Sequence, residues 1–310
     1  MAPYYKIALI QLYPEPLQPD LNYAKAANYI VSAAMRGAKL AVLPEYHLTN
    51  WAPEDPKFRE ICTQWEKYLN KYKELAKKLK ICIVPGTIVQ TYQHGEGVEE
   101  QLHNIAYFIG PDGEILGRYQ KKNIWHPERP HLTSSSEHPH LTFDTPLGPV
   151  GLLICWDLAF PEAFRELIAS GAKMIIIPTF WTLTDCSPAA LALNPLSESL
   201  FLQTTVVARA FENTAAIVFV NAGAAPPASP GYKEDSHYAG LSQVALPFVG
   251  GLGDETKSTS REGMSIVEVD MVVVEEAERN YKVRADINGE AWHYSYRHQS
   301  FGQEEVKQEQ

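Results

Sequence analysis

Short apolar runs alternate along the chain with longer segments in which apolar residues recur every three or four positions. The short runs, rich in Ile and Val, predict buried β-strands, and the longer segments predict amphipathic helices. Their regular alternation is typical of an α/β fold. We expect strands at Ile7–Gln11, Leu40–Leu43, Ile81–Val84, Val150–Ile154, Met174–Ile177 and Ala216–Val220, and helices at Asn22–Met35, Lys57–Leu79, Pro161–Ala169 and Ser197–Phe211.

Two segments, residues 34–44 and 169–178, share one pattern. In each, a Gly that ends a helix precedes a short apolar run, and a Pro ends that run. The likeness favours two related α-β halves within one domain. The Gly and Pro residues that commonly end helices and strands would explain it equally well. Between the halves, Pro111-Asp112-Gly113 separates Asn104–Ile109 from Ile115–Tyr119, which predicts a β-hairpin.

No low-complexity segment marks a second domain, so we expect one domain over residues 1–285. Residues 286–310 end in a polar, Glu- and Gln-rich tail. We interpret them as a C-terminal extension that is mobile or contacts a neighbouring subunit. Ala224–Ser236, rich in Ala, Pro and Gly, predicts a surface loop.

The composition narrows the class of partner. Of the 310 residues, 45% are hydrophobic and 21% charged, and the formal net charge is -10. Nucleic acids and anionic membranes are bound by clustered Lys and Arg, so this balance favours a small-molecule partner instead. The start of the chain lacks a signal-peptide pattern, and no apolar run is long enough to span a bilayer. Four cysteines without metal-ligand spacing indicate free thiols in a reducing compartment, and we expect a cytoplasmic protein.

Cys155 is the first candidate for chemistry. It follows the apolar run Val150–Ile154 and precedes the helix that opens at Pro161, which places a thiol on a strand-to-helix turn. Such turns expose a side chain among backbone N–H groups that can hold a developing negative charge. A buried cysteine acting as a small hydrophobe is the alternative.

Glu45 and Lys121 each follow a predicted strand. Glu45 comes directly after Leu40–Pro44, where an apolar wall would raise its pKa and suit it to proton transfer, or where it reaches the solvated rim. Lys121 ends the second hairpin strand next to Lys122. Successive side chains of a strand alternate faces, so only one of the two points inward, and both could also be solvated.

Taken together, three blocks resemble those of the nitrilase superfamily of carbon–nitrogen hydrolases. The resemblance extends over most of the chain, from Ile7 to near Asp270. The blocks are Pro44-Glu45-Tyr46, Arg118-Tyr119-Gln120-Lys121 and Leu153–Glu162, and further likeness lies in Asn104-Ile105-Ala106, Arg209–Asn213 and Asn221-Ala222-Gly223. After Ser242 the chain departs from the family pattern, with several glycines between Gln243 and Gly253.

The resemblance implies a four-layer α-β-β-α sandwich, a homodimer or higher homo-oligomer, and neither metal nor organic cofactor. It implies Glu45 as general base, Lys121 as the cation that stabilises an oxyanion, and Cys155 as nucleophile. Glu128 matches a second glutamate found in many members, and a solvated loop glutamate is the alternative. Four aromatic residues adjoin these blocks and could line a substrate pocket or serve only in the core: Trp156, Trp181, Tyr46 and Trp51.

The predicted function is hydrolysis of a non-peptide carbon–nitrogen bond through a thioester, by an amidase or N-carbamoyl amine amidohydrolase that releases ammonia. Asp157, in place of the glutamate frequent in nitrilases, favours amides or carbamoyl amines. A nitrilase acting on a C≡N group is the runner-up. A catalytically inactive dimeric binding module is the alternative from another class. A dinucleotide-binding protein is disfavoured because no Gly-x-Gly-x-x-Gly turn follows the first strand.

Overall fold

The computed structural model describes residues 3–93, 100–227, 229 and 237–294. These residues form two β-sheets. The first has the strand order β13-β1-β2-β3-β5-β4, with β6 also paired to β5, and the second has the order β12-β11-β10-β9-β8-β7. The strands of the first sheet are β1 (Tyr4–Gln11), β2 (Leu40–Val42), β3 (Cys82–Val84), β4 (Thr87–Tyr92), β5 (Gln101–Ile109), β6 (Ile115–Gln120) and β13 (Gly263–Asp270). Those of the second are β7 (Thr142–Thr145), β8 (Gly148–Leu152), β9 (Met174–Thr179), β10 (Ala216–Asn221), β11 (Gln243–Leu246) and β12 (Gly250–Leu252).

Each sheet has three parallel strands at its centre and antiparallel strands beside them. The parallel sets are β1, β2 and β3 in one sheet and β8, β9 and β10 in the other. The two segments that share a sequence pattern end in β2 and β9, the middle strand of each set. The carboxyl ends of parallel strands meet at one edge of a sheet, so the chain segments that follow them are brought together.

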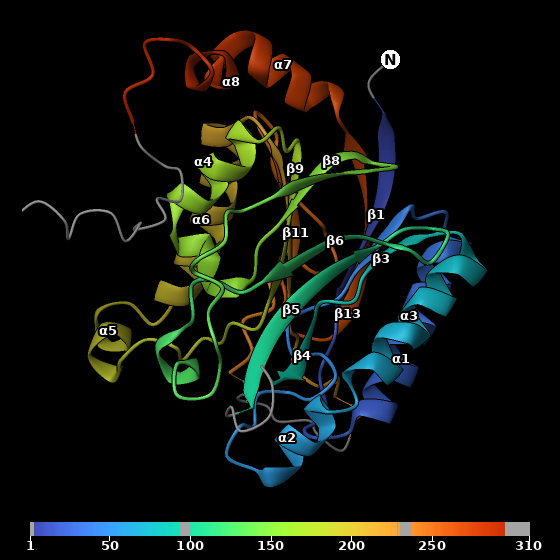
Figure 1. The fold of residues 1–310 in the computed structure, drawn as a ribbon. Coiled ribbons are helices and arrows are strands. Elements are labelled where there is room, and N and C mark those ends of the chain that lie inside the picture. Colours follow the sequence, from blue (N-terminus) through green and yellow to red (C-terminus); the bar gives the residue numbers. More distant parts are fainter. Residues whose placement is uncertain (1–2, 94–99, 228, 230–236, 295–310) are drawn as a thin grey trace, which may run out of the picture.

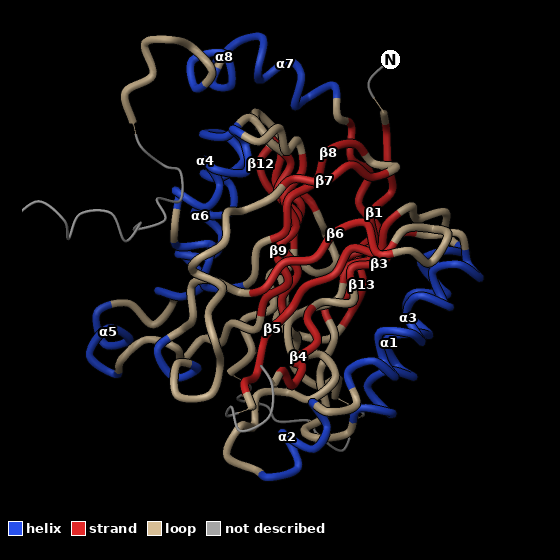
Figure 2. Tube along the Cα trace, viewed as in Figure 1, coloured by secondary structure: helices blue, strands red, loops and turns tan. Residues whose placement is uncertain are grey.

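The layers follow from the alternation of side chains along the strands. In β1, Ile7 and Leu9 belong to the core between the sheets, whereas Ala8 and Ile10 pack on the opposite face. That opposite face is covered by α1 (Pro19–Met35) and α3 (Trp65–Leu79), and the second sheet is covered by α4 (Pro161–Ala169) and α6 (Ser197–Asn213) (Figures 1 and 2). The predicted four-layer α-β-β-α sandwich is confirmed.

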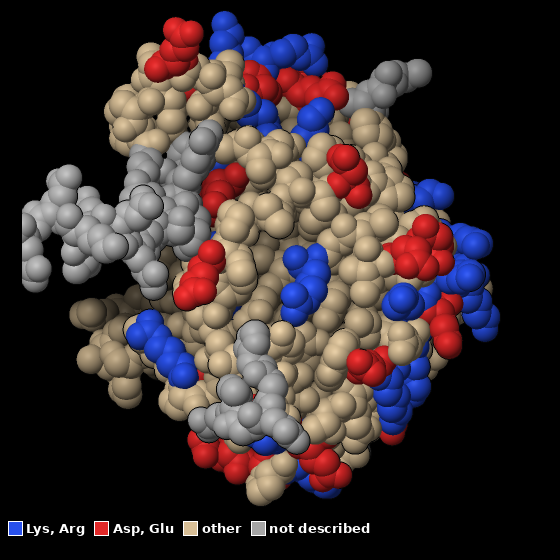
Figure 3. Space-filling model, viewed as in Figure 1, with Lys and Arg blue, Asp and Glu red and all other residues tan. Residues whose placement is uncertain are grey.

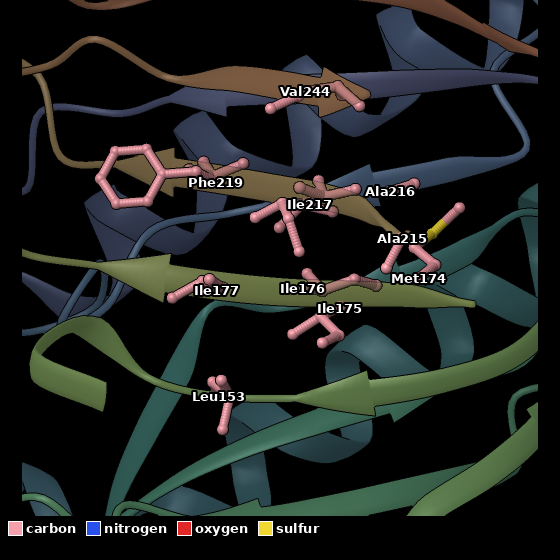
Figure 4. Packing of buried hydrophobic residues seen from close by; sticks show 14 of the residues in the cluster. Leu153, Met174, Ile175, Ile176, Ile177, Ala215, Ala216, Ile217, Phe219 and Val244 are labelled. Atoms are coloured by element: carbon pink, nitrogen blue, oxygen red, sulfur yellow. The ribbon is translucent and has the colours of Figure 1, made fainter. Parts of the chain in front are cut away.

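The second sheet has a continuous aliphatic core. Figure 4 shows side chains of β9 and β10 side by side, among them Ile175, Ile176, Ile217 and Phe219, all completely buried. At about 25 cal/mol for each Å² of apolar surface removed from water, this burial is the main term that holds the strands in place. The ends of β8 and β9 are therefore rigid supports for the segments that follow them.

The prediction of one helix over Lys57–Leu79 is wrong. The chain forms α2 (Pro56–Cys62), breaks at Thr63 and Gln64, and resumes as α3. The apolar residues of the two helices face different cores: those of α2 pack around Tyr46, and those of α3 pack behind the first sheet. A single straight helix cannot direct its apolar stripe to both.

Other elements agree with the sequence or extend it. The predicted hairpin is β5 and β6, with Gly113 at positive φ in its turn. In the glycine-containing segment after Ser242, β11 and β12 form a hairpin at the edge of the second sheet, and Gly250 and Gly251 lie in β12. Sequence reasoning did not identify α5 (Pro188–Leu193), α7 (Val272–Tyr281), α8 (Val283–Ile287), β4, β7, β11, β12 or β13.

The C-terminal extension is described only in part. Helix α8 crosses the predicted boundary at residue 285, and its last residue, Ile287, belongs to the core between and around the sheets. Residues 295–310 lie outside the described residues, as does much of the predicted loop Ala224–Ser236. Within the part described, no helix combines the length and apolar character that crossing a membrane requires. On the face drawn in Figure 3, acidic and basic residues are interspersed.

Candidate active site

Four chain segments that follow strands meet where the two sheets face each other. Glu45 lies just beyond β2, Lys121 directly after β6, Cys155 just beyond β8, and Phe180 directly after β9. Glu45 and Lys121 are completely buried and Cys155 nearly so. The structure thus brings together three candidates that are 34 to 110 positions apart in sequence.

Lys121 lies between two carboxylates. Its Nζ donates to Oε1 of Glu45 at 2.9 Å and to Oε1 and Oε2 of Glu128 at 2.8 and 2.7 Å. Glu128, in the short 3₁₀ turn His126–Glu128, also accepts from the hydroxyl of Tyr46 and from the backbone N–H of Trp125. Glu128 is therefore a buried member of the cluster and not a solvated loop glutamate.

Cys155 begins a 3₁₀ turn, Cys155–Ala159, and adopts a positive φ of 47°. This conformation is costly for a residue with a side chain and indicates a position fixed by its surroundings. The backbone of Phe180 connects the thiol with the carboxylate: its N–H donates to Oε2 of Glu45 at 2.9 Å, and its carbonyl oxygen lies 3.7 Å from Sγ of Cys155. The Cys155 thiol and the Glu45 carboxylate thus both contact the backbone of the residue that follows β9.

Burial sets the protonation of the carboxylate. It raises the pKa of Glu45 to about 7, in part offset by the charge of Lys121 and reinforced by that of Glu128. Burial also disfavours the charged form of Lys121, but the two carboxylates outweigh it and raise the Lys121 pKa, so the ammonium stays charged. A carboxyl that titrates near neutrality beside a permanent cation is suited to moving protons.

The thiol is not ionised by its surroundings. Burial, and then the charge of Glu45, raise the pKa of Cys155 well above the ordinary thiol value, and Lys121 opposes this without overcoming it. The charge of Lys121 is already matched by the carboxylates of Glu45 and Glu128. The Glu45 carboxylate is bonded to Phe180, the same residue whose carbonyl contacts this thiol.

This geometry agrees with the comparison of the chain with known families. The family model described as carbon-nitrogen hydrolase matches residues 6–279. The chain belongs to the nitrilase superfamily of carbon-nitrogen hydrolases. It is therefore an enzyme that acts on carbon–nitrogen bonds other than peptide bonds, as predicted.

Relatives of this carbon-nitrogen hydrolase include a nitrilase of Pyrococcus abyssi, 30% identical over 202 residues, which are 64% of this chain and 73% of the relative. An omega-amidase of Homo sapiens is 30% identical over 188 residues, 58% of this chain and 65% of that protein, just under two thirds of its length. A carbon-nitrogen hydrolase from Helicobacter pylori G27 has the same fold, with a TM-score of 0.77 at 21% identity over 91% of this chain and 94% of the other.

Asn104 is a member of the hydrolase site to which sequence reasoning gave no role. Its Nδ2 donates to Oε1 of Glu45 at 2.7 Å and to the Tyr46 hydroxyl at 3.1 Å. The signal was present: Asn104 shares a face of β5 with Ala106 and Phe108, which belong to the core between the sheets. A fully buried amide on that face needs a polar partner.

The four predicted substrate-binding residues form two separate groups. The rings of Trp156 and Trp181 lie 5.4 Å apart between centroids, and Trp125, which sequence reasoning did not select, lies 4.4 Å from Trp156. Tyr46 and Trp51 lie 4.8 Å apart on the side of Glu128. The backbone N–H and carbonyl of Trp181 are fixed by the amide of Asn221.

A cavity of about 370 Å³ adjoins the Trp156 ring. Its volume fits a small organic molecule. Two basic residues contribute to its wall, and neither forms an ion pair with any described carboxylate. The lining residues are Lys122, Asn123, Ile124, Arg129, Leu132, Ser134, Trp156 and Phe160. Glu45, Lys121 and Cys155 do not line it; it lies beside their loops and not around their reactive atoms.

No cluster of three or more His, Cys, Asp or Glu side chains that could hold a metal ion occurs among the residues that the structure describes. The chemistry available at the site is that of a thiol, two carboxylates, an ammonium and backbone N–H groups.

Proposed function

We propose that the chain is a cysteine-dependent amidase or N-carbamoyl amine amidohydrolase that releases ammonia through a thioester. The observation that supports this proposal best is the backbone of Phe180, whose carbonyl contacts the Cys155 thiol and whose N–H bonds the Glu45 carboxylate, while Glu45 is also bonded to Lys121. In this proposal a nucleophile, a base with a pKa near neutrality and a permanent cation lie together.

In the first step, Sγ of Cys155 attacks the carbonyl carbon of the substrate. An S–C bond forms, the π electrons of the carbonyl move to oxygen, and the thiol proton passes to Glu45. Because the resting thiol is protonated, the proton must leave as the bond forms, which requires Glu45 in its ionised form.

The resulting oxyanion is stabilised by the charge of Lys121 and by the N–H of Trp156. An N–H in the first turn of a helix has no partner within that helix and is free to donate. All three protons of the Lys121 ammonium are engaged in the structure, two of them with Glu128. Donation to the oxyanion therefore requires that one of these three bonds be released.

Collapse of the tetrahedral intermediate breaks the C–N bond. Glu45 returns the proton to the departing nitrogen, which leaves as ammonia. The ionised carboxylate then takes a proton from water, whose oxygen attacks the thioester, and breakage of the S–C bond regenerates the thiol with that proton. The net reaction is amide plus water to carboxylic acid plus ammonia.

A parallel ammonia-release assay tests the function and its substrate class. Wild type and Cys155→Ala are assayed on a primary amide, an N-carbamoyl amine and the matching nitrile. We expect the wild type to release ammonia from the amide or the carbamoyl amine, and we expect Cys155→Ala to be inactive. Turnover of the nitrile alone would instead establish the nitrilase.

Thiol reactivity separates a working enzyme from a binding module. Burial raises the pKa of both Cys155 and Cys62, but in the proposed site Glu45 is placed to take the Cys155 proton, so iodoacetamide should label Cys155 in preference to Cys62. Labelling of Cys155 no faster than Cys62, together with no ammonia release, would favour a catalytically inactive dimeric module.

We also propose a cytoplasmic homodimer, as the family resemblance and the free cysteines suggest. Light scattering during size-exclusion chromatography tests the subunit number: twice the chain mass of 34.7 kDa is expected, and a monomer at micromolar concentration would contradict it.

A further inference from the structure

Asp157 is a completely buried carboxylate that forms no ion pair among the described residues. A carboxylate in that position is costly unless hydrogen bonds replace its water. Four do so. Oδ1 accepts from the backbone N–H of Asn123 at 3.1 Å and from its Nδ2 at 2.8 Å; Oδ2 accepts from the Tyr119 hydroxyl at 2.8 Å and from the N–H of Ile154 at 2.9 Å.

The donors are placed around two catalytic residues. Tyr119 and Asn123 lie two positions before and two positions after Lys121, and Ile154 directly precedes Cys155. The Tyr119 hydroxyl also accepts from the backbone N–H of Lys122 at 3.3 Å. One side chain therefore holds the segment that carries the ammonium and the turn that carries the thiol.

The sequence interpretation of Asp157, as an indicator of substrate class, did not include these contacts within the protein. Both of its oxygens are occupied by protein donors, and Asp157 does not line the cavity beside Trp156. We propose, on the basis of the function proposed above, that Asp157 is a positioning residue that fixes Lys121 and Cys155 relative to each other.

The proposal has a physical reason in the backbone of Cys155. Its positive φ is unfavourable, and the bond from the Ile154 N–H to Asp157 closes the turn that imposes it. If the turn relaxes, Sγ and Nζ separate. Displacement of catalytic groups by about 1 Å can lower rates about 100-fold.

Asp157→Asn tests the role. The amide keeps the shape of the side chain, but its NH₂ must face two of the four donors. Two of the four hydrogen bonds are therefore lost. We expect kcat per folded molecule to fall at least about 10-fold while KM changes less than about threefold. Asp144→Asn, which removes an exposed carboxylate, is the matched control and should match the wild type.

Alkylation of Cys155 by iodoacetamide separates misalignment from general damage. Attack on a CH₂ group needs the thiol and its base but no support for an oxyanion. In Asp157→Asn the alkylation rate should stay within about threefold of the wild type while amide hydrolysis falls. A purely structural role would lower both rates together or change only the thermal midpoint.

Two milder variants keep the test decisive if Asp157→Asn does not fold. Tyr119→Phe and Asn123→Ala each remove a single bond to Asp157, and each should lower kcat with little change in KM. A kcat within twofold of an active wild type in every folded variant, or a parallel loss of alkylation, overturns the positioning role. A wild type that hydrolyses no amide overturns the proposed function and this role with it.

Discussion

The ammonium nitrogen of Lys121 lies 2.9 Å from Oε1 of Glu45, and both side chains are completely inaccessible to water. The pair alone would be neutral, but Glu128 adds a second carboxylate on the same ammonium at 2.7 Å. When both carboxyls are ionised, the cluster of Glu45, Glu128 and Lys121 therefore carries one excess negative charge. The excess, together with burial, explains why Glu45 holds a proton up to near pH 7.

The pH dependence of kcat/KM should show this directly. Glu45 accepts the thiol proton only when ionised, so we expect kcat/KM to rise with pH and level off above an apparent pKa of about 7. A limb centred near pH 4.5, the ordinary value for a glutamate, would show that Glu45 is not the base.

The same shift affects folding stability with a defined sign. The folded pKa of Glu45, about 7, exceeds the ordinary value of 4.5, so the folded chain binds more protons between these values than the unfolded chain. The stability that this group contributes is complete below pH 4.5 and is lost as pH rises through 7. In Glu45→Gln, urea denaturation at pH 5 and pH 8 should give a smaller difference than in the wild type.

Asn104→Leu should move the pH profile without removing any group that reacts. The amide donates to the ionised carboxylate of Glu45, and loss of that bond raises the Glu45 pKa further. We expect the ascending limb of kcat/KM to shift to higher pH. If the ascending limb of kcat/KM stays at the same pH and only its plateau falls, Asn104 serves only in packing and does not set the pKa of Glu45.

Lys121→Met should be close to inactive and also less stable. It leaves Glu45 and Glu128 buried without their cation, a loss that typically costs about 3–5 kcal/mol of folding free energy. Loss of the oxyanion donor removes a further factor of about 100 to 1,000 in kcat. Lys122→Met, the neighbouring half-buried lysine, is the control. Retention of more than a tenth of wild-type kcat in Lys121→Met would rule out its role.

Gly86→Ala should disturb the segment that carries Glu45. A Cβ at this position would lie 1.8 Å from the carbonyl oxygen of Pro44, and φ there is positive. Gly148→Ala is a matched control, since φ is also positive but nothing lies within 4 Å of the added atom. Thermal unfolding should show a loss of about 1 kcal/mol for the control and at least about 3 kcal/mol for Gly86→Ala, because only the latter adds a clash. Equal losses would contradict this account.

The sequence predicted the elements with strong periodicity and the residues that follow them. Pro161–Ala169 is a helix with those bounds, and Glu45, Lys121 and Cys155 follow β2, β6 and β8. Whether a residue follows a buried strand depends only on the residues next to it in the chain, so it can be predicted from one sequence. The packing of the two sheets against each other was predicted only from the family resemblance.

What the sequence did not predict depends on packing between distant segments. The break between α2 and α3 arises because their apolar faces meet different cores. The contact of Phe180 with both Glu45 and Cys155 involves only its backbone, and no residue type signals it. The partners of Asp157 are likewise set by how two loops meet, which spacing along the chain does not reveal.

The residues of the candidate site come from both sheets. Glu45 follows β2 of the first sheet, whereas Cys155 and Phe180 follow β8 and β9 of the second. Neither half of the sandwich alone contains the thiol together with its proposed base, so the proposed activity requires that the two layers have packed against each other.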